Sequence, residues 1–511
     1  MKRREILKGL VTLPLVGALA YGAYQRNKYF EQVDQEMLDD IQLDLDPLPE
    51  IKAFTGKPLK IGIIGCGLRM KYILKSLGYV SPETIDEYRK KAETDEAWER
   101  FLNSYLNQPE LGVEITALCD VFDVNAELGI RICENKKKQG TAEFTRTNSV
   151  KRYSTYQELI SSEDVDAVII ATPDHMHAPI SIAAAQSRKH IYCEKPFSWS
   201  LAETYALRDQ IKKNDVVFQL GHQNRQIEAY NVAAKLIKKN VLGKVSLIEV
   251  TTNRNSKNGA WVYPIHKEAN PNNIDWKQFI GQAPWHDFDL KRFFRWRCWW
   301  DYSTGLSGDL FTHDYDAMNQ IMDLDIPASA MASGGIYYHK DGRTVPDTLN
   351  MSFEFDKQEL SLLYSATQSS SRKRGRMIMG HDASMKVDQD LKIYIDRDST
   401  KYKDKIEKGL IDPSQPMFTY SPGAGELDAI TSATERYFAG RGLMFTNRSG
   451  KQYDTTFLHL HEWLNCIRDR SIKPSCDIDR SFEEGITALM GTISYKEGRR
   501  IYWDAEKESL I

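Results

Sequence analysis

The chain has 511 residues, of which 41% are hydrophobic and 27% are charged, and its formal net charge at pH 7 is −3. This length exceeds what one hydrophobic core ordinarily serves, so we expect at least two domains. The nearly balanced charge argues against a nucleic-acid partner, and the irregular spacing of the seven cysteines argues against a disulfide scaffold.

The first segment, residues 1–24, has the pattern of an export signal. Arg3 and Arg4 precede an apolar run of about 15 residues, which is shorter than the roughly 20 residues that span a bilayer. The pattern resembles a twin-arginine signal, with a small-residue cleavage site at Ala18-Leu19-Ala20. We therefore expect an exported, periplasmic protein, and membrane contact only through this segment; the alternative is an N-terminus that stays membrane-anchored. Residues 25–57 are interpreted as a linker or arm.

A dinucleotide-binding turn is predicted in LKIGIIGCGLRMKYILKSL, which begins at residue 59. The pattern is a strand, a glycine turn and a helix, the geometry in which a pyrophosphate binds at a helix N-terminus. Gly65 and Gly67 occupy the first two glycine positions of the fingerprint, and Leu68 and Arg69 open the helix. Met70 replaces the third glycine, which serves helix–strand packing, so the phosphate site is retained.

A second strand, residues 113–121, carries Asp120 at its end, where an acidic residue binds the ribose hydroxyls. The separation from Gly67 is far greater than the usual distance of about 20 residues. A charged, helical-looking insertion, residues 81–112, accounts for the excess and is interpreted as a surface lid or subunit contact. We predict that Asp120 binds ribose, the alternative being a turn residue. Because a carboxylate disfavours a 2′-phosphate, NAD is favoured over NADP.

Two further buried strands are predicted at residues 166–171 and 190–193. In a doubly wound sheet the carboxyl ends of the strands face the cofactor crevice, so the sequences TPDHMH and EKP that follow these strands are expected there. The residues expected at the cofactor are Thr172, Pro173, His177, Glu194 and Lys195.

The sequence GLSGDLFTHDYD, residues 305–316, places Asp309, His313 and Asp316 at positions i, i+4 and i+7. In a helix these side chains share one face. Such a face could serve catalysis. The alternatives are a solvated polar face and a metal site, but no H-x-H or C-x-x-C pair with suitable spacing lies nearby, so we predict no metal.

An aromatic and basic stretch, residues 285–305, precedes this helix. Trp and Tyr rings stack on the apolar faces of pyranose sugars, and Arg binds hydroxyls or carboxylates. We predict that Arg297, Trp300 and Tyr302 contact the substrate, although aromatic runs also occur in cores.

With GCGLR, CDV, ATPDHMH, CEKP and the D-x-x-x-H pair in this order, residues 58–505 resemble the Gfo/Idh/MocA oxidoreductases, which include glucose–fructose oxidoreductase and inositol dehydrogenase. The resemblance implies an α/β fold with an N-terminal Rossmann domain, residues 58–225. It further implies a C-terminal α+β domain, residues 226–511, with an open, mostly antiparallel sheet. The substrate pocket would lie between the domains, and the protein would form a homo-oligomer.

The resemblance also implies that Lys195, Asp309 and His313 form the catalytic group. His313 would accept the hydroxyl proton, the Lys195 ammonium would stabilise alkoxide character, and Asp309 would hold the lysine or the substrate. Asp316 is expected to cap or orient His313. Arg225 matches a family position near the cofactor crevice, the alternative being a salt bridge at the domain boundary.

These features favour a nicotinamide-dependent oxidoreductase that acts on a hydroxyl of a sugar or sugar derivative. An NAD-dependent glycosidase that oxidises transiently, eliminates the aglycone and reduces again is the enzymatic alternative. A third interpretation, a sugar-binding protein without catalysis, predicts that Lys195 and His313 are dispensable.

Export of a folded protein predicts a tightly bound cofactor, because free NAD is scarce outside the cytoplasm. Denaturation of the purified protein should release NAD(H), which mass spectrometry of the supernatant detects. If no dinucleotide is released, and added NAD and NADP also fail to bind, the oxidoreductase interpretation is wrong.

Overall fold

The computed structural model describes residues 50–511, except residues 139–140, 148–149, 257–259, 421–444 and 449–450. The predicted export signal and most of the predicted arm therefore lie outside the described residues. Within the part of the chain that is described, no helix combines the length and the apolar character that crossing a bilayer requires.

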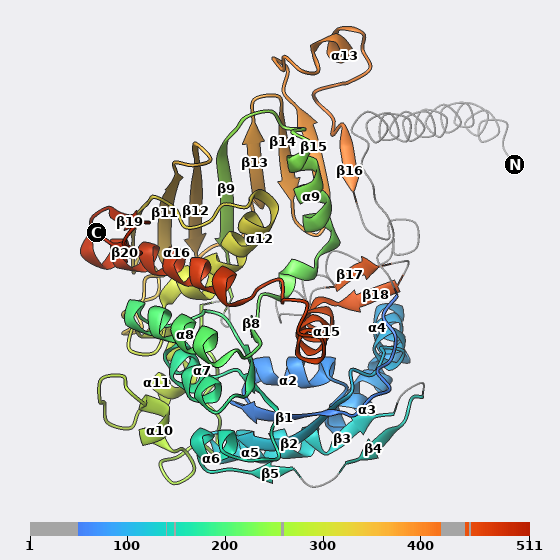
Figure 1. Cartoon of the computed structure of the whole chain (residues 1–511), viewed down its shortest axis with the longest axis vertical. Coiled ribbons are helices and arrows are strands. Elements are labelled where there is room, and N and C mark those ends of the chain that lie inside the picture. Colours follow the sequence, from blue (N-terminus) through green and yellow to red (C-terminus); the bar gives the residue numbers. More distant parts are fainter. Residues whose placement is uncertain (1–49, 139–140, 148–149, 257–259, 421–444, 449–450) are drawn as a thin grey trace, which may run out of the picture.

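The first domain contains a six-stranded parallel sheet in the order β5-β2-β1-β6-β7-β8 (Figure 1). All four residues of the central strand β6 are buried, as expected for a sheet that is covered on both faces. This arrangement confirms the predicted Rossmann domain. The strands are β1 (Leu59–Ile64), β2 (Val113–Cys119), β5 (Lys151–Arg152), β6 (Ala167–Ile170), β7 (His190–Cys193) and β8 (Phe218–Leu220).

Helices connect these strands, and two of them begin with a capping box, at Thr155 and at Ser200. In each box the hydroxyl accepts a backbone N–H while a glutamate three residues on accepts the N–H of the cap, which satisfies two free donors. The helices are α2 (Leu68–Ser76), α5 (Asp123–Cys133), α6 (Tyr156–Ile160), α7 (His177–Gln186) and α8 (Leu201–Asn214).

The insertion between β1 and β2 forms a helical hairpin, as its sequence predicted. Its helices are α3 (Pro82–Ala92) and α4 (Glu96–Leu106), and the small ribbon beside it is β3 (Asn135–Lys137) paired with β4 (Phe144–Arg146). The buried ammonium of Lys137 donates to the carbonyls of Tyr105, Leu106 and Gln108. Because these carbonyls end α4, Lys137 satisfies acceptors that the helix leaves free.

The second domain contains a ten-stranded sheet in the order β16-β15-β14-β13-β9-β12-β11-β10-β19-β20. Only the pairing of β9 with β12 is parallel, so the predicted mostly antiparallel sheet is confirmed. The strands are β9 (Val245–Asn253), β10 (Ser329–Gly335), β11 (Thr348–Phe355), β12 (Leu360–Thr367), β13 (Arg376–Gly380), β14 (Ala383–Val387), β15 (Leu391–Ile395), β16 (Phe418–Tyr420), β19 (Ile501–Asp504) and β20 (Ser509–Leu510).

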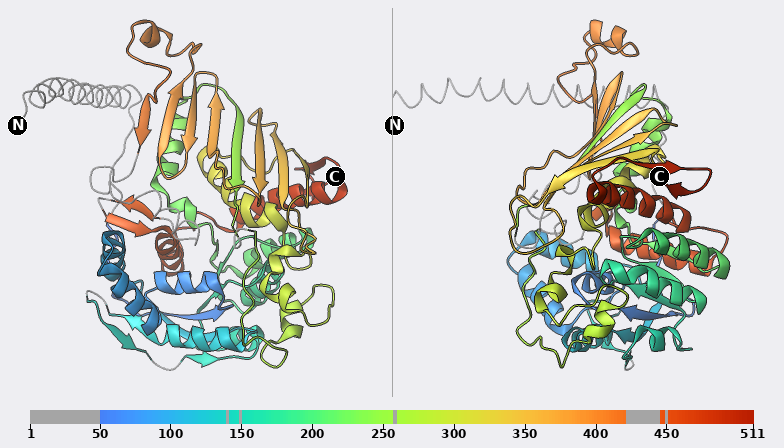
Figure 2. Two further views of the ribbon diagram at one scale, coloured as in Figure 1. Left: turned by 180° about the vertical axis from the view of Figure 1, so that it is seen from behind. Right: turned by 90° about the vertical axis from the view of Figure 1, so that its left-hand side faces the viewer.

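One face of this sheet is covered by three helices, and the last of them in the chain also packs against the first domain (Figures 1 and 2). They are α9 (Glu228–Lys238), α12 (Thr312–Met322) and α16 (Ile478–Glu497). The remaining elements are α10 (Trp276–Ile280), α11 (Leu290–Phe294), α13 (Lys403–Glu407), α15 (Thr455–Arg468), β17 (Phe445–Arg448) and β18 (Lys451–Asp454).

Helix α15 corrects the predicted domain boundary. The sequence assigned residues 226–511 to the second domain, but Phe457 and Trp463 of α15 belong to the core that contains β1 and α2. Ile51, within the predicted arm, is buried in the same core. The chain therefore returns to the first domain, where the apolar face of α15 packs into the core. All seven cysteines are buried and free.

The second core holds α12 through a stack of aromatic rings. Phe311 lies directly before α12 and stacks on Phe353 of β11, with ring centroids 4.7 Å apart. Both side chains are fully buried. We expect Phe353→Ala to lower the free energy of unfolding by about 3–5 kcal/mol, because it removes a ring and leaves a cavity. Chemical denaturation monitored by circular dichroism measures this loss.

Leu363→Ala on the adjacent strand β12 is the control, because that side chain is 40% exposed. It should cost well under half as much. Equal losses in the two variants would contradict the assignment of Phe353 to the support of α12.

Candidate functional site

The glycine turn lies at the carboxyl end of β1. Gly65 has a φ of +84°, and a Cβ there would come within 2.9 Å of the Ala171 carbonyl oxygen, so only glycine fits. A Cβ at Gly67 would meet open space, and the first turn of α2 carries no acidic residue and no side-chain cap. The free N–H groups of that turn, which begins at the exposed Leu68, therefore suit an anion.

Asp120 lies at the end of β2 and faces the glycine turn. Its carboxylate accepts the backbone N–H of Cys66 at 2.5 Å and that of Phe122 at 2.8 Å. Burial raises the pKa of Asp120 to about 6, although these hydrogen bonds oppose the shift. Asp120 thus fastens the glycine turn to β2, and ribose binding by the remaining lone pairs stays a prediction.

The loop after β6 is tied to both neighbouring segments by buried polar groups. The imidazole of His177 lies between two carbonyl oxygens, 2.8 Å from that of Pro196 and 2.9 Å from that of Thr172. The carboxylate of Asp174 accepts the backbone N–H and the hydroxyl of Thr304. His177 was predicted to bind the cofactor, but its ring is buried and both nitrogens are engaged within the protein, so it joins the two loops instead.

Glu194 and Arg69 connect the EKP loop to the glycine turn. The guanidinium Nε of Arg69 donates to Glu194 at 2.7 Å, and both side chains are mostly buried. Arg69 lies in the first turn of α2 and Glu194 directly follows β7. The pair therefore brings the two predicted cofactor segments to one edge of the sheet, next to Thr172 and Pro173, which follow β6.

Lys195 and Asp309 form a buried ion pair between the two domains. The lysine Nζ donates to the Asp309 carboxylate at 2.8 Å and to its backbone carbonyl at 2.6 Å, and Arg297 Nε donates to the same carboxylate at 3.1 Å. Burial would raise the pKa of Asp309, but the charges of Lys195 and Arg297 outweigh burial and hold that pKa well below its usual range. The carboxylate is therefore ionised at neutral pH.

The helix that carries Asp309 and His313 is irregular at the site. Residues Ser307–Phe311 form a π-helical turn, in which the N–H of Thr312 reaches the carbonyl of Ser307, before α12 begins. Such turns are frequent at functional sites. The sequence predicted a helix with all three polar residues on one face, and the wider turn changes this spacing. The backbone carbonyl of Asp309 accepts a hydrogen bond from the Lys195 ammonium.

His313 lies beside the ion pair with a neutral ring. Burial lowers the pKa of His313 well below 6.5, and the charges of Lys195 and His222 lower it further. Its Nδ1 is buried without a hydrogen-bond partner among the described residues. A neutral imidazole in this position has a lone pair that accepts a proton.

The predicted contact between Asp316 and His313 is wrong. Asp316 accepts the guanidinium Nε of Arg225 at 2.5 Å instead. Arg225 also donates to Glu484 at 3.3 Å and to the Ser475 carbonyl at 2.7 Å. Its donors are thus engaged in a buried salt bridge, which is the alternative that the sequence left open for this arginine.

Of the three predicted substrate residues, only Arg297 contacts the Lys195–Asp309 ion pair. Tyr302 is fully buried and packs between the rings of His175 and Phe279, so its face is closed to a sugar. Trp300 packs against Tyr495, and the Lys496 ammonium lies 4.3 Å from its ring centroid. The prediction for Tyr302 is corrected, because its ring is enclosed in the core of the second domain. Trp300 is only partly buried against that core, so its contact with the substrate stays a prediction.

Two site residues escaped the sequence analysis. His222 lies within GHQNRQ, where only Arg225 was singled out, and its ring contacts that of His313 with centroids 5.4 Å apart. Glu484 lies in α16, far along the chain, and lies 2.6 Å from His222 Nε2. The polar motif was a usable signal for His222; no local pattern marks Glu484.

Asp309→Asn should lower the free energy of unfolding at pH 7 by about 3–5 kcal/mol, because two cations lose their buried partner. A carboxylate whose folded pKa is lowered stabilises the protein above its unfolded pKa, about 3.9, and this stabilisation is lost as the pH falls through the folded pKa. The deficit should therefore persist down to about pH 4 and shrink below it. Denaturant titrations across this range measure it.

The control is Asp164→Asn, since Asp164 and Lys60 also form a pair at 2.8 Å but on the exposed surface. It should cost far less than Asp309→Asn, because solvent screens an exposed pair. A similar cost for both variants would show that burial of the Lys195–Asp309 pair is unimportant.

Models of both domains of one oxidoreductase family match the chain. The NAD-binding Rossmann fold of the Gfo/Idh/MocA oxidoreductases matches residues 123–222, and their C-terminal alpha/beta domain matches residues 234–501. The second match alone covers more than half of the chain.

Curated relatives align over shorter stretches. Levoglucosan dehydrogenase of Pseudarthrobacter phenanthrenivorans is 28% identical over 191 residues, which cover 36% of this chain and 42% of the relative. The 2,7-anhydro-N-acetylneuraminate hydratase of Escherichia coli is 26% identical over 237 residues, 46% of this chain and 55% of the relative. Myo-inositol 2-dehydrogenase of Thermotoga maritima is 26% identical over 167 residues, 32% and 43% of the two chains. The chain thus aligns with about half the length of these relatives.

Solved structures share the fold over almost their whole length. Levoglucosan dehydrogenase in complex with NADH and levoglucosan has a TM-score of 0.54 at 17% identity, covering 87% of this chain and 99% of that one. The WlbA dehydrogenase of Chromobacterium violaceum, in complex with NADH and UDP-GlcNAcA, has a TM-score of 0.54 at 12% identity, covering 90% and 99%. The family models and the two-domain architecture together establish that this chain belongs to the Gfo/Idh/MocA oxidoreductase family.

Proposed function

We propose that this protein is a nicotinamide-dependent oxidoreductase that transfers hydride between NAD and a hydroxyl group of a sugar or sugar derivative. The observation that carries the proposal is the Lys195–Asp309 pair with the neutral His313 beside it. Lys195 follows β7 in the EKP loop, which Glu194 and Arg69 tie to the glycine turn. Proton-transfer groups are therefore held at the edge of the sheet where a dinucleotide binds.

The residues at this edge fit NAD. The backbone turn at Gly65 and Gly67 and the uncapped start of α2 suit the pyrophosphate. The hydroxyl of Thr172 is buried without a partner among the described residues, which provides a free hydrogen-bonding group there. Asp120 would bind the ribose hydroxyls and disfavour a 2′-phosphate. Bound NAD supplies the acceptor for the hydride that leaves the substrate carbon.

The chain's own residues account for the proton chemistry of such an oxidation. The neutral His313 ring accepts the hydroxyl proton as the carbon–hydrogen bond breaks. The Lys195 ammonium, fixed by two oxygens of Asp309, stabilises the negative charge that develops on the substrate oxygen. Arg297 donates to the same oxygen of Asp309 as Lys195 does, and it helps to hold that carboxylate in place.

Two kinds of relative support a carbohydrate substrate. Levoglucosan dehydrogenase and myo-inositol 2-dehydrogenase bear names that state oxidation of a sugar or cyclitol. The hydratase relative favours a second candidate function, in which transient oxidation is followed by elimination and reduction, as in an NAD-dependent glycosidase. The same Lys195 and His313 would serve both reactions, since each begins with loss of a hydroxyl proton and a hydride.

We also propose that the protein is exported. The proposal rests on Arg3 and Arg4, the short apolar run after them, and the absence of disulfide bonds among the seven buried cysteines. A chain that folds in the reducing cytoplasm, with its cofactor bound, meets the requirements of twin-arginine transport.

The purified enzyme should form NADH from one or more members of a panel of sugars, anhydrosugars and cyclitols, measured by absorbance. With saturating NAD, kcat/KM should stay level as the pH falls to 6.5 and decline only below it. A base must be unprotonated, and the pKa of His313 is lowered from 6.5, so protonation inactivates it only in more acidic solution. His313→Ala should lower kcat/KM by about 10²–10⁴-fold and abolish this acid limb.

Glycosides added to the same assay separate the two reactions: aglycone release without net NADH indicates the elimination cycle. Lys60→Met, at an exposed surface pair, is the control for Lys195→Met. Full activity of Lys195→Met and His313→Ala would refute both catalytic proposals and leave a binding protein.

A further inference from the structure

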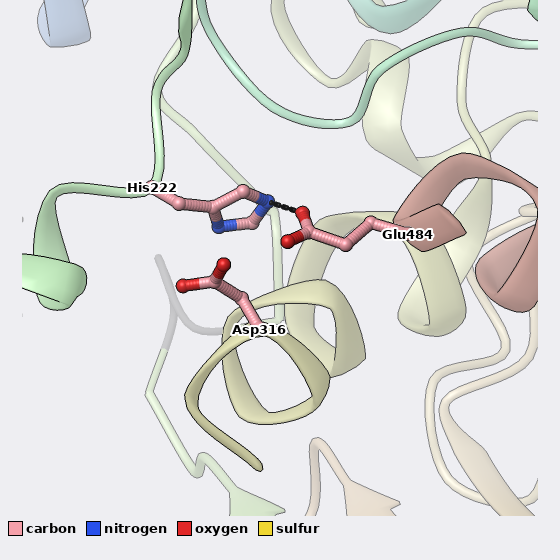
Figure 3. Close-up of side chains that lie close together, drawn as sticks. All are labelled: His222, Asp316 and Glu484. Atoms are coloured by element: carbon pink, nitrogen blue, oxygen red, sulfur yellow. Dashed lines mark ion pairs between the residues drawn. The ribbon is translucent and has the colours of Figure 1, made fainter. Parts of the chain in front are cut away.

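A second cluster of charged side chains lies behind His313 and is completely enclosed. His222 follows β8, Asp316 lies in α12 and Glu484 in α16, and each is at most 1% exposed (Figure 3). Arg225, from the short helical segment after His222, supplies the only cation that bonds to these carboxylates among the described residues. Four segments thus converge on one buried group of charged side chains.

Two groups of this cluster lie in close contact. His222 Nε2 and Glu484 Oε2 are 2.6 Å apart, the contact drawn in Figure 3. Both atoms are buried and neither has a hydrogen-bond partner among the described residues, so this is a close ion-pair contact without hydrogen-bond geometry. Two ligands of one zinc ion, each about 2.0–2.2 Å from it, would lie roughly 3.3 Å apart in a tetrahedral site. With Arg225 also bound to Asp316, the cluster does not suit a metal ion.

Charge balance fixes the protonation of the cluster. Asp316 and Glu484 together outnumber the single guanidinium of Arg225, and a net buried charge is unfavourable, so the carboxyls retain one proton. Burial raises the pKa of Asp316 to about 7 and also raises that of Glu484. Burial lowers the pKa of His222 to about 4, so the ring is neutral.

The neutral His222 ring meets the ring of His313 at a right angle. Their centroids are 5.4 Å apart with an interplanar angle of 89°, an edge-to-face contact. Lys195 and His459 are the other titratable neighbours of His222, besides the members of the cluster. His222 therefore lies between the fixed carboxylate of Glu484 and the imidazole that we assign as the base.

We propose that His222 is a positioning residue for His313, and that the close contact with Glu484 keeps the His222 ring in place. The proposal rests on the function proposed above for His313. The His313 ring has no hydrogen bond at Nδ1 among the described residues to set its rotation. The perpendicular ring of His222 supplies that constraint by packing, and Glu484 prevents His222 itself from turning.

The kinetic test compares His222→Gln and Glu484→Gln with the wild type. The first variant removes the ring edge but retains an N–H for Glu484; the second leaves Arg225 paired with Asp316, so the buried charge stays balanced. Each should lower kcat about tenfold or more, because the base is misplaced. The KM values for sugar and NAD should change less than about twofold, and the solvent deuterium isotope effect on kcat should rise as proton transfer becomes slower.

His190→Gln is the matched control, since His190 accepts a backbone N–H at the opposite end of β7. It should leave kcat and the isotope effect unchanged. Unchanged kcat in His222→Gln, or a fall in kcat with an unchanged isotope effect, overturns the positioning role while the proposed function stands. Absence of NAD-dependent activity in the wild type contradicts the proposed function instead.

A crystal structure of the full-length His222→Gln variant tests the inference without any activity assay. We expect the His313 ring to rotate or to occupy two conformers; a ring that superposes on the wild type overturns the proposal. Metal analysis of the purified wild-type protein by mass spectrometry tests the alternative. A stoichiometric divalent metal that is lost from both Gln variants would assign the cluster as a metal site and overturn the positioning role.

Discussion

The ion pair between Lys195 and Asp309 is the interaction on which the site depends. Its two side chains come from different domains and are only 11% and 6% exposed. Buried charges repay their desolvation only when their hydrogen-bonding capacity is met, and here the carboxylate has two cationic partners and the ammonium two oxygens of Asp309. Because breaking such a pair leaves an uncompensated buried charge, the packing of the domains and the geometry of the proposed proton-transfer groups are maintained together.

The helix that carries Asp309 and His313 is held from three directions. The Lys195 pair binds it at the first domain, the stack of Phe311 on Phe353 fixes it to the sheet, and the Arg225–Asp316 pair fastens its next turn. The π-helical turn within it would be costly in an isolated helix, since it departs from regular hydrogen bonding. An irregular turn of this kind persists where contacts with the surrounding structure stabilise it, and the three contacts named above do so.

The solved structures and the curated relatives match this chain over different lengths. Solved relatives share the fold over 87% or more of this chain at 17% identity or less, whereas curated relatives align over less than half of it. Backbone architecture depends on hydrophobic pattern and tolerates extensive substitution. A sugar site depends on individual side chains at loops and helix starts, where insertions such as α3–α4 also occur. Membership of the family therefore indicates the type of reaction better than it indicates the substrate.

The sequence by itself determined the parts of the protein that local patterns specify. The glycine turn at Gly65, the buried strand before Lys195 and the alternating strands of the second sheet follow from nearest-neighbour chemistry and periodicity. The partners of polar side chains were decided only by the tertiary structure. Arg225 bonds to Glu484 across 259 residues, and Tyr302 is enclosed by segments that the aromatic run does not contain. Burial by distant segments sets which charges meet and which rings face solvent, and no local pattern encodes that.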